Sequence, residues 1–163
     1  LIPGLPNKIH HVNVGGILRN AQSEYRRQQA ANAVTPAMAK AGPVLEEMLA
    51  SGQILPSWVT VMLMKEEFKA IAQGVAEQRE KQPDYSAGIL VDGFPRSLEN
   101  LGSFEELMGP ARRLIEITCD DNAMIKRVLA RGAAVGGRED DQSVETIQKR
   151  LNVFHGQTHD VLA

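Results

Sequence analysis

The apolar and polar positions of this chain follow two different periods, which predict strands and helices in alternation. Short runs that are apolar or alternate with polar residues predict strands, whereas apolar residues three and four positions apart predict helices with one buried face. The predicted strands span residues 9–14, 87–91 and 113–119. The predicted helices span residues 17–34, 36–51, 57–81, 98–107, 121–131 and 144–154. This alternation indicates an α/β fold in which helices flank a parallel β-sheet.

The second and third predicted helices carry the clearest signals. Thr35 suits the N-cap of the second helix, Pro36 suits its first turn, and Gly52 suits its C-terminal end. The apolar stripe of this helix consists of Met38, Ala41, Leu45, Met48 and Leu49. The stripe of the third helix consists of Val61, Met64, Phe68, Ile71 and Val75. Both stripes predict helices that pack against a common core.

The segment 88–100, Gly-Ile-Leu-Val-Asp-Gly-Phe-Pro-Arg-Ser-Leu-Glu-Asn, carries the strongest candidate chemistry. Its apolar run ends at Asp92, and a Gly-Phe-Pro turn leads to Arg96. In an open α/β sheet, groups just past the carboxyl end of a strand face the ligand crevice. Asp92 can therefore hold a hydrated cation, and Arg96 can clamp a phosphate with its planar guanidinium. For the Asp-Gly pair taken alone, an ordinary turn after a core strand is the alternative.

Composition narrows the classes of partner. The formal net charge is −2 at pH 7 and aromatic residues make up 4%, which argues against nucleic-acid and anionic-membrane binding. Cys119 is the single cysteine, so an internal disulfide and a cysteine-based zinc site are both excluded. No apolar run reaches the length of a membrane span and no secretory signal is present, so we expect a cytoplasmic location.

Arginines stand at several positions where a phosphate ligand could use them. Besides Arg96, they are Arg19, Arg127, Arg131, Arg138 and Arg150. Phosphoryl transfer depends on positioning and on positive charge near the phosphate oxygens, which such side chains supply. A single arginine is more often a solvated surface residue. The functional interpretation therefore requires that the fold brings these side chains together.

Segment 88–100 resembles the signature of the nucleoside monophosphate kinases, the family of the adenylate and UMP-CMP kinases. Further similar stretches are residues 11–19, 49–56, 127–132, 138–141 and 153–158. The resemblance covers nearly the whole chain and implies a P-loop NTPase-like nucleoside monophosphate kinase fold. It also implies a single domain over residues 1–163, with a monophosphate-binding part at about 15–80 and a short lid at about 132–142. A lid of this length without a Cys or His set is similar to that of members without structural zinc.

The resemblance implies a role for each candidate residue on the monophosphate side. Arg19 and Arg96 would hold the phosphate of the nucleoside monophosphate. Asn100 would lie where the family reads the base. These three residues are the implied substrate-binding set.

On the ATP side, the resemblance implies one cofactor-binding residue and four catalytic residues. Arg127 would stack on the base of ATP, and Arg131 would face the phosphoryl group in transfer. Arg138 would be the lid arginine, and Arg150 a further phosphate-binding arginine. Asp92 would act on magnesium through water. The implied cofactors are Mg²⁺ and ATP, and the implied partners are nucleoside monophosphates and triphosphates.

The chain departs from the family pattern in three ways. It contains no Gly-x-x-x-x-Gly-Lys-Ser/Thr phosphate loop, whose family position would precede Leu1. Val14 and Gly16 stand where the family has Thr and Asp. The sequence stops at Ala163, before the last strand and helix that the family would have. We therefore expect a fold that is incomplete at both ends, belonging to a longer chain or a larger assembly.

Two functions follow from the sequence. The first is a nucleoside monophosphate kinase that converts ATP and a monophosphate into ADP and a diphosphate. Adenylate kinase is the first expectation and UMP-CMP kinase the second, although Glu99-Asn100-Leu101 and Cys119-Asp120 favour the UMP-CMP branch. The alternative is a catalytically inactive adenylate-kinase-like domain that serves as a structural or nucleotide-sensing module.

Overall fold

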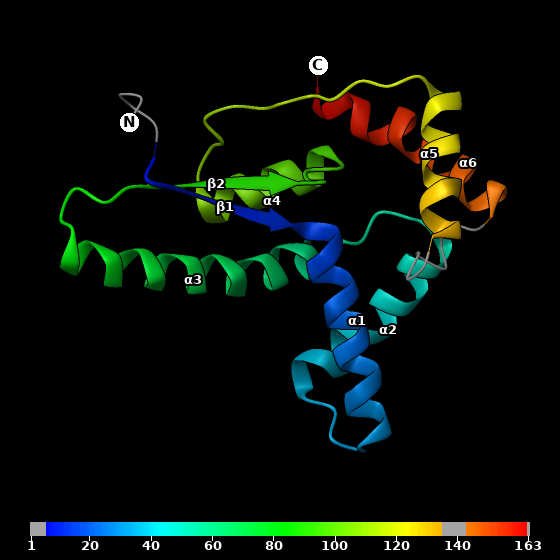
Figure 1. Cartoon of the computed structure of the whole chain (residues 1–163). Coiled ribbons are helices and arrows are strands. Elements are labelled where there is room, and N and C mark those ends of the chain that lie inside the picture. The colour runs from blue at the N-terminus through cyan, green and yellow to red at the C-terminus, as the bar shows by residue number, and fades with distance from the viewer. Residues whose placement is uncertain (1–5, 135–142, 163) are drawn as a thin grey trace.

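The computed structural model describes residues 6–134 and 143–162, and Figure 1 shows the arrangement of their helices and strands. In chain order the elements are β1 (Lys8–Asn13), α1 (Val14–Ala30), α2 (Pro36–Ser51), α3 (Ser57–Lys81), β2 (Ala87–Asp92), α4 (Leu98–Met108), α5 (Asp121–Ala133), α6 (Val144–Val153), the π-helical turn η2 (Phe154–Thr158) and the 3₁₀ turn η3 (His159–Val161). Two parallel strands flanked by helices confirm the predicted α/β class.

The two strands pair in a register that brings their carboxyl ends to the same edge. Lys8 pairs with Ala87 at one end, and Asn13 pairs with Asp92 at the other. The connection between them runs through α1, α2 and α3, as parallel pairing requires a long crossover. The segments that follow Asn13 and Asp92 therefore start next to each other at this edge of the sheet.

The predicted strand at residues 113–119 is wrong. The structure gives this segment no regular secondary structure, and the Ile117 side chain is 90% exposed. A strand needs a neighbour for its backbone hydrogen bonds, and β1 and β2 pair with each other in the described part of the chain. Alternation of polar and apolar residues predicts a strand with one buried face, but it does not show that a neighbouring strand is available for pairing.

The first helix begins and ends earlier than the sequence pattern predicts. The Asn13 side chain accepts a hydrogen bond from the backbone N–H of Gly16 at 2.8 Å, so α1 starts at Val14 rather than at residue 17. Near its other end, Asn32 takes a left-handed conformation with φ of 50°, and the helix stops at Ala30. The early start places the first turn of α1 directly at the carboxyl edge of the strands.

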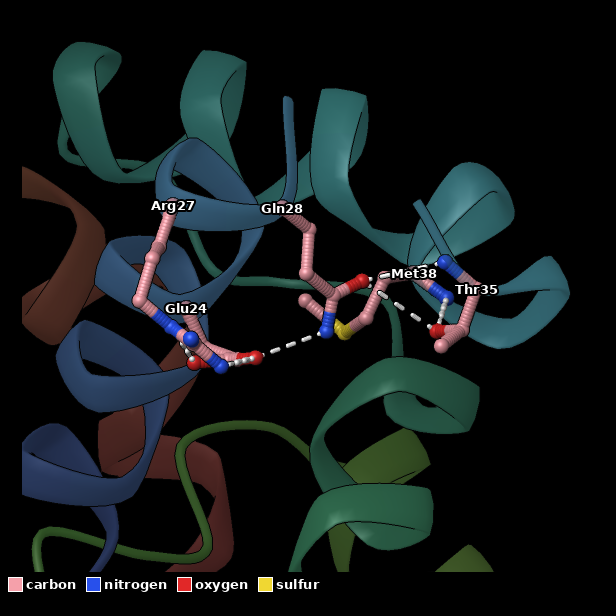
Figure 2. A network of polar contacts seen from close by, with 5 residues as sticks. All are labelled: Glu24, Arg27, Gln28, Thr35 and Met38. Carbon is pink, nitrogen blue, oxygen red and sulfur yellow. Dashed lines mark hydrogen bonds and ion pairs between the residues drawn. The ribbon is translucent and has the colours of Figure 1, made fainter. Parts of the chain in front are cut away.

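Helix α2 begins and ends at the predicted residues. The Thr35 hydroxyl accepts a hydrogen bond from the N–H of Met38, and Gly52 ends the helix with φ of 72°. Figure 2 shows how this start is tied to α1. The Gln28 side chain accepts hydrogen bonds from the backbone N–H and the hydroxyl of Thr35, and donates to Glu24. Hydrogen bonds from Arg27 and Gln28 lower the pKa of Glu24 to about 2.

The core lies where β1 meets the first three helices. Its buried residues are Val12, Val14, Leu18, Ala41, Leu45, Leu55, Val59, Met64 and Phe68. Three phenylalanines extend the packing to the turn after β2. The Phe104 ring makes edge-to-face contacts with Phe68 and with Phe94, at centroid distances of 5.9 and 5.5 Å. The Gly93–Arg96 turn is therefore anchored on the same core as α3.

The last helices also follow the predicted pattern, apart from one side chain. The Asp120 and Ser143 side chains cap α5 and α6, and Ile147 and Leu151 are buried. Phe154, predicted on the same face, is exposed because the chain leaves α-helical geometry there and enters η2. Within the described residues, no helix combines the length and apolar character that crossing a membrane would need.

Candidate functional site

The candidate site lies at the carboxyl edge of the paired strands. Asp92 ends β2 opposite Asn13, and its side chain is exposed. The Nε2 atom of His11, on β1, lies 3.3 Å from Oδ2 of Asp92. Gly93 follows with φ of 75°, a left-handed conformation that glycine adopts without strain. The predicted position of Asp92 beyond the carboxyl end of a strand therefore agrees with the observed topology.

Hydrogen bonds from the turn itself, from α4 and from η2 hold Arg96. The Nε of Arg96 donates to the carbonyl of Gly93 at 2.9 Å. Its backbone N–H donates to Oδ1 of Asn100 at 3.3 Å, and its carbonyl accepts from the hydroxyl of Thr158 at 2.8 Å. The side chain itself is exposed. A fixed backbone thus presents a solvent-accessible guanidinium beside the end of β2.

Arg19, on α1, lies over Gly15, which follows β1 as Gly93 follows β2. A Cβ atom added to Gly15 would lie 3.2 Å from Nη1 of Arg19, so this half-buried side chain folds back over the first turn of α1. Similarly, a Cβ atom added to Gly93 would lie 3.5 Å from Nη2 of Arg96. Each guanidinium therefore covers a glycine that follows one of the two paired strands. The structure thus places Arg19 and Arg96 at the same edge of the strands, and their binding of a substrate stays a prediction.

Asn100 is a buried link between helices. Its side chain is 2% exposed, its Nδ2 donates to the hydroxyl of Ser57 at 2.8 Å, and its Oδ1 accepts from the backbone of Arg96. Glu99 completes the link, because its carboxylate accepts a hydrogen bond from the N–H of Ser57 at the start of α3. In this conformation both polar ends of Asn100 are bonded within the protein. Because Asn100 is 2% exposed, a contact with a base would require the residues that cover its carboxamide to move.

Two further residues at the site, Ser57 and Thr158, were not predicted. Their hydrogen bonds to Asn100 and Arg96 span 43 and 62 residues of sequence. No local pattern signals such contacts. The resemblance did place residue 158 within a similar stretch, but it assigned no role to its hydroxyl.

The remaining arginines lie on the last helices or outside the described part. Arg127 and Arg131 are exposed on α5, which packs against α6. Arg150, on α6, lies against the turn between α2 and α3, with its Cγ 3.4 Å from the position of a Cβ atom on Gly52. In Figure 1 the arrowheads of both strands point toward the side where α5 and α6 stand. Arg138 and most of the predicted lid fall at residues 135–142, outside the described residues.

The carboxylate of Asp92 at the strand edge suits an indirect contact with a metal ion. Among the described residues, no group of three or more His, Cys, Asp and Glu side chains could hold a metal ion directly. A single exposed carboxylate, that of Asp92, fits Mg²⁺ that keeps its waters and takes its other ligands from phosphate oxygens. The contact of Asp92 with Mg²⁺ through water stays a prediction.

Comparison with known proteins defines the class of this chain. The family model described as adenylate kinase matches residues 7–163. A UMP-CMP kinase of Lentinula edodes is 32% identical over 158 residues, which cover 93% of this chain and 60% of that protein. An adenylate kinase of Parvibaculum lavamentivorans is 32% identical over 127 residues, covering 75% of this chain and 56% of its own. A uridylate kinase of Saccharomyces cerevisiae is 29% identical over 144 residues, which cover 88% of this chain and 59% of that protein.

The chain therefore belongs to the adenylate kinase family of nucleoside monophosphate kinases, which confirms the predicted resemblance. It spans at most 60% of the length of these three relatives. The relatives include kinases named for adenylate, for uridylate and for both UMP and CMP, at similar identities. Sequence identity alone thus does not select a base.

Proposed function

We propose that this protein transfers a phosphoryl group from ATP to a nucleoside monophosphate, yielding ADP and a nucleoside diphosphate. AMP is the first candidate substrate, and UMP or CMP the second. The observation that carries this proposal is the pair of guanidinium groups, Arg19 and Arg96, over Gly15 and Gly93 at one edge of the parallel strands. That edge is where open α/β sheets bind ligands.

The two guanidinium groups would bind the phosphate of the monophosphate. Each offers a planar set of N–H donors that matches phosphate oxygens, and charge-assisted hydrogen bonds of this type are among the strongest in proteins. The backbone of Arg96 is already fixed by Asn100 and Thr158, so little reorganisation is needed on binding. Positioning of this kind supplies most of the catalysis that a protein can offer to phosphoryl transfer.

Asp92 would hold hydrated Mg²⁺ beside the bound phosphates. When bound with ATP, this ion supplies positive charge to the phosphate oxygens. The His11 imidazole next to Asp92 would keep that carboxylate at the strand edge. The role of Asp92 follows from its exposed side chain and its place at the end of β2.

The other arginines complete the proposal on the ATP side. Arg131, Arg138 and Arg150 would neutralise the phosphates during transfer, and Arg127 would stack on the base of ATP. These assignments rest on the family resemblance of their positions. A cytoplasmic location is part of the same proposal, and cell fractionation with an antibody would test it.

A catalytically inactive module is the second candidate function. It is favoured by one observation, namely the residues at the start of α1. Val14 and Gly16 stand there, where the family resemblance implies the polar side chains of Thr and Asp. Their replacement leaves fewer polar contacts for a bound nucleotide near the strand edge.

A coupled assay of the purified protein with ATP and AMP, UMP or CMP distinguishes the two. The kinase proposal predicts turnover with at least one monophosphate and a loss of about 100-fold or more in Arg96→Ala, with an unchanged circular dichroism spectrum. Arg79→Ala is the matched control, because Arg79 bonds to the carbonyl of Tyr85, before β2 begins, and should keep its activity. No turnover, together with no binding of an inhibitor that links two nucleotides, would exclude the kinase and favour the inactive module.

A further inference from the structure

The carbonyl of Arg96 contacts the C-terminal part of the chain. The hydroxyl of Thr158, at the end of η2, donates a hydrogen bond to this carbonyl at 2.8 Å. Thr158 is half-buried, and η3, which follows it, packs against α4. The contact therefore joins the last turns of the described chain to the turn that presents the candidate phosphate clamp.

Two hydrogen bonds on either side of the Arg96 Cα atom restrain its geometry. Oδ1 of Asn100 holds the N–H of Arg96, which belongs to the peptide plane before the Cα atom. Thr158 holds the carbonyl, which belongs to the plane after it. Because each peptide unit is planar, the two bonds together restrain φ and ψ of Arg96. The direction in which its side chain leaves the backbone is restrained as well.

The same C-terminal stretch also contacts the C-terminal end of α2. Arg150, about one helical turn before η2, lies against Gly52 between α2 and α3. Residues 150–158 therefore contact both the turn that follows α2 and the turn that follows β2. Because η2 follows α6 directly, we expect a shift of α6 relative to α2 to reach the carbonyl of Arg96.

We propose that Thr158 is a positioning residue for Arg96 and that it couples the placement of α6 to the binding of the monophosphate. This inference rests on the proposed function, because it takes Arg96 as the phosphate clamp. Thr158 does not touch the substrate. Its hydroxyl sets the backbone from which the Arg96 guanidinium reaches the strand edge.

The first arm of the test needs no nucleotide and no activity. Thr158→Val keeps the shape of the side chain and removes the donor, whereas Thr158→Ser keeps the donor. In the valine variant we expect the carbonyl ¹³C resonance of Arg96 to shift upfield and the amides of residues 96–100 to exchange faster. Thr158→Ser should match the wild type. Thr118→Val is the control, because Thr118 is exposed in the irregular segment after α4.

The second arm measures the Michaelis constants for both substrates. We expect Thr158→Val to raise KM for the monophosphate by about five- to tenfold, the loss expected for one intramolecular hydrogen bond. KM for ATP should stay within about twofold, and Thr158→Ser should restore the wild-type value. This split between the two substrates is the signature of a residue that acts through Arg96 rather than through global stability.

Two results would overturn the inference. One is a valine variant in which only amides of residues 154–161 exchange faster, while the Arg96 carbonyl resonance and KM for the monophosphate stay unchanged. In that case Thr158 stabilises only the C-terminal turns η2 and η3. The other is a serine variant that behaves like the valine variant. If the wild type neither binds nor turns over a monophosphate, the proposed function fails, while the resonance of Arg96 still decides the role of Thr158.

Discussion

Gly42→Ala should destabilise the protein although alanine is the better helix former. Gly42 is buried in α2, and a Cβ atom there would lie 2.3–2.4 Å from three ring carbons of Tyr25 on α1. An ordinary contact is at 3.4–4 Å, so the ring would have to retreat by about 1 Å. Overpacking of this kind costs about 1–3 kcal/mol, whereas the gain in helix propensity is about 1 kcal/mol. The difference is a net loss of about 0–2 kcal/mol, and we expect the upper half of this range, about 1–2 kcal/mol, since the clash is with a rigid ring.

Urea unfolding of the variant measures this loss, which corresponds to a decrease in Tm of about 2–8 °C. Gly74→Ala in α3 is the matched control, because no atom lies within 4 Å of a Cβ atom at that position. That change should stabilise the protein by about 0.5–1 kcal/mol. In a double-mutant cycle, Tyr25→Leu should remove most of the penalty of Gly42→Ala. If Gly42→Ala were as stabilising as Gly74→Ala, the close packing of α1 on α2 would be refuted.

Two further predictions concern the polar network between these helices. The Glu24 carboxyl should titrate near pH 2 in a ¹³C NMR titration, because Arg27 and Gln28 donate hydrogen bonds that lower its pKa from 4.5. Since the folded pKa is the lower one, its stabilisation is present above pH 4.5 and lost as the pH falls through about 2; a titration near 4.5 would contradict this. Thr35→Ala should cost about 1 kcal/mol in urea unfolding by removing the N-cap of α2, while Thr35→Ser should not.

Much of the fold could be predicted because its signals are local. Thr35 and Gly52 bound α2 by their own side-chain and backbone chemistry, and both act at the expected ends. Asp92 ends a strand because the apolar run before it stops there. The segment 113–119 could not be predicted in this way, since a strand exists only through a neighbour whose position no local pattern encodes.

The candidate site shows the same division between local and distant signals. The places of Arg19 and Arg96 at the strand edge follow from the strand-turn pattern in which each one stands. The contacts that hold Arg96, from Asn100 and from Thr158, depend on how α4 and η2 pack. Asn100 was predicted to face a base, whereas the structure shows it joined to Ser57. Whether it also reaches a base stays a prediction.

The central claim is that Arg19 and Arg96 form the phosphate clamp of a nucleoside monophosphate site. Titration calorimetry of the protein with AMP, UMP and CMP tests it most directly. The account predicts binding of at least one of them, and a loss of affinity of about tenfold or more in Arg19→Ala and in Arg96→Ala, the effect expected for a charge-assisted hydrogen bond. Arg79→Ala should bind like the wild type. Equal affinities in all four proteins would contradict the claim.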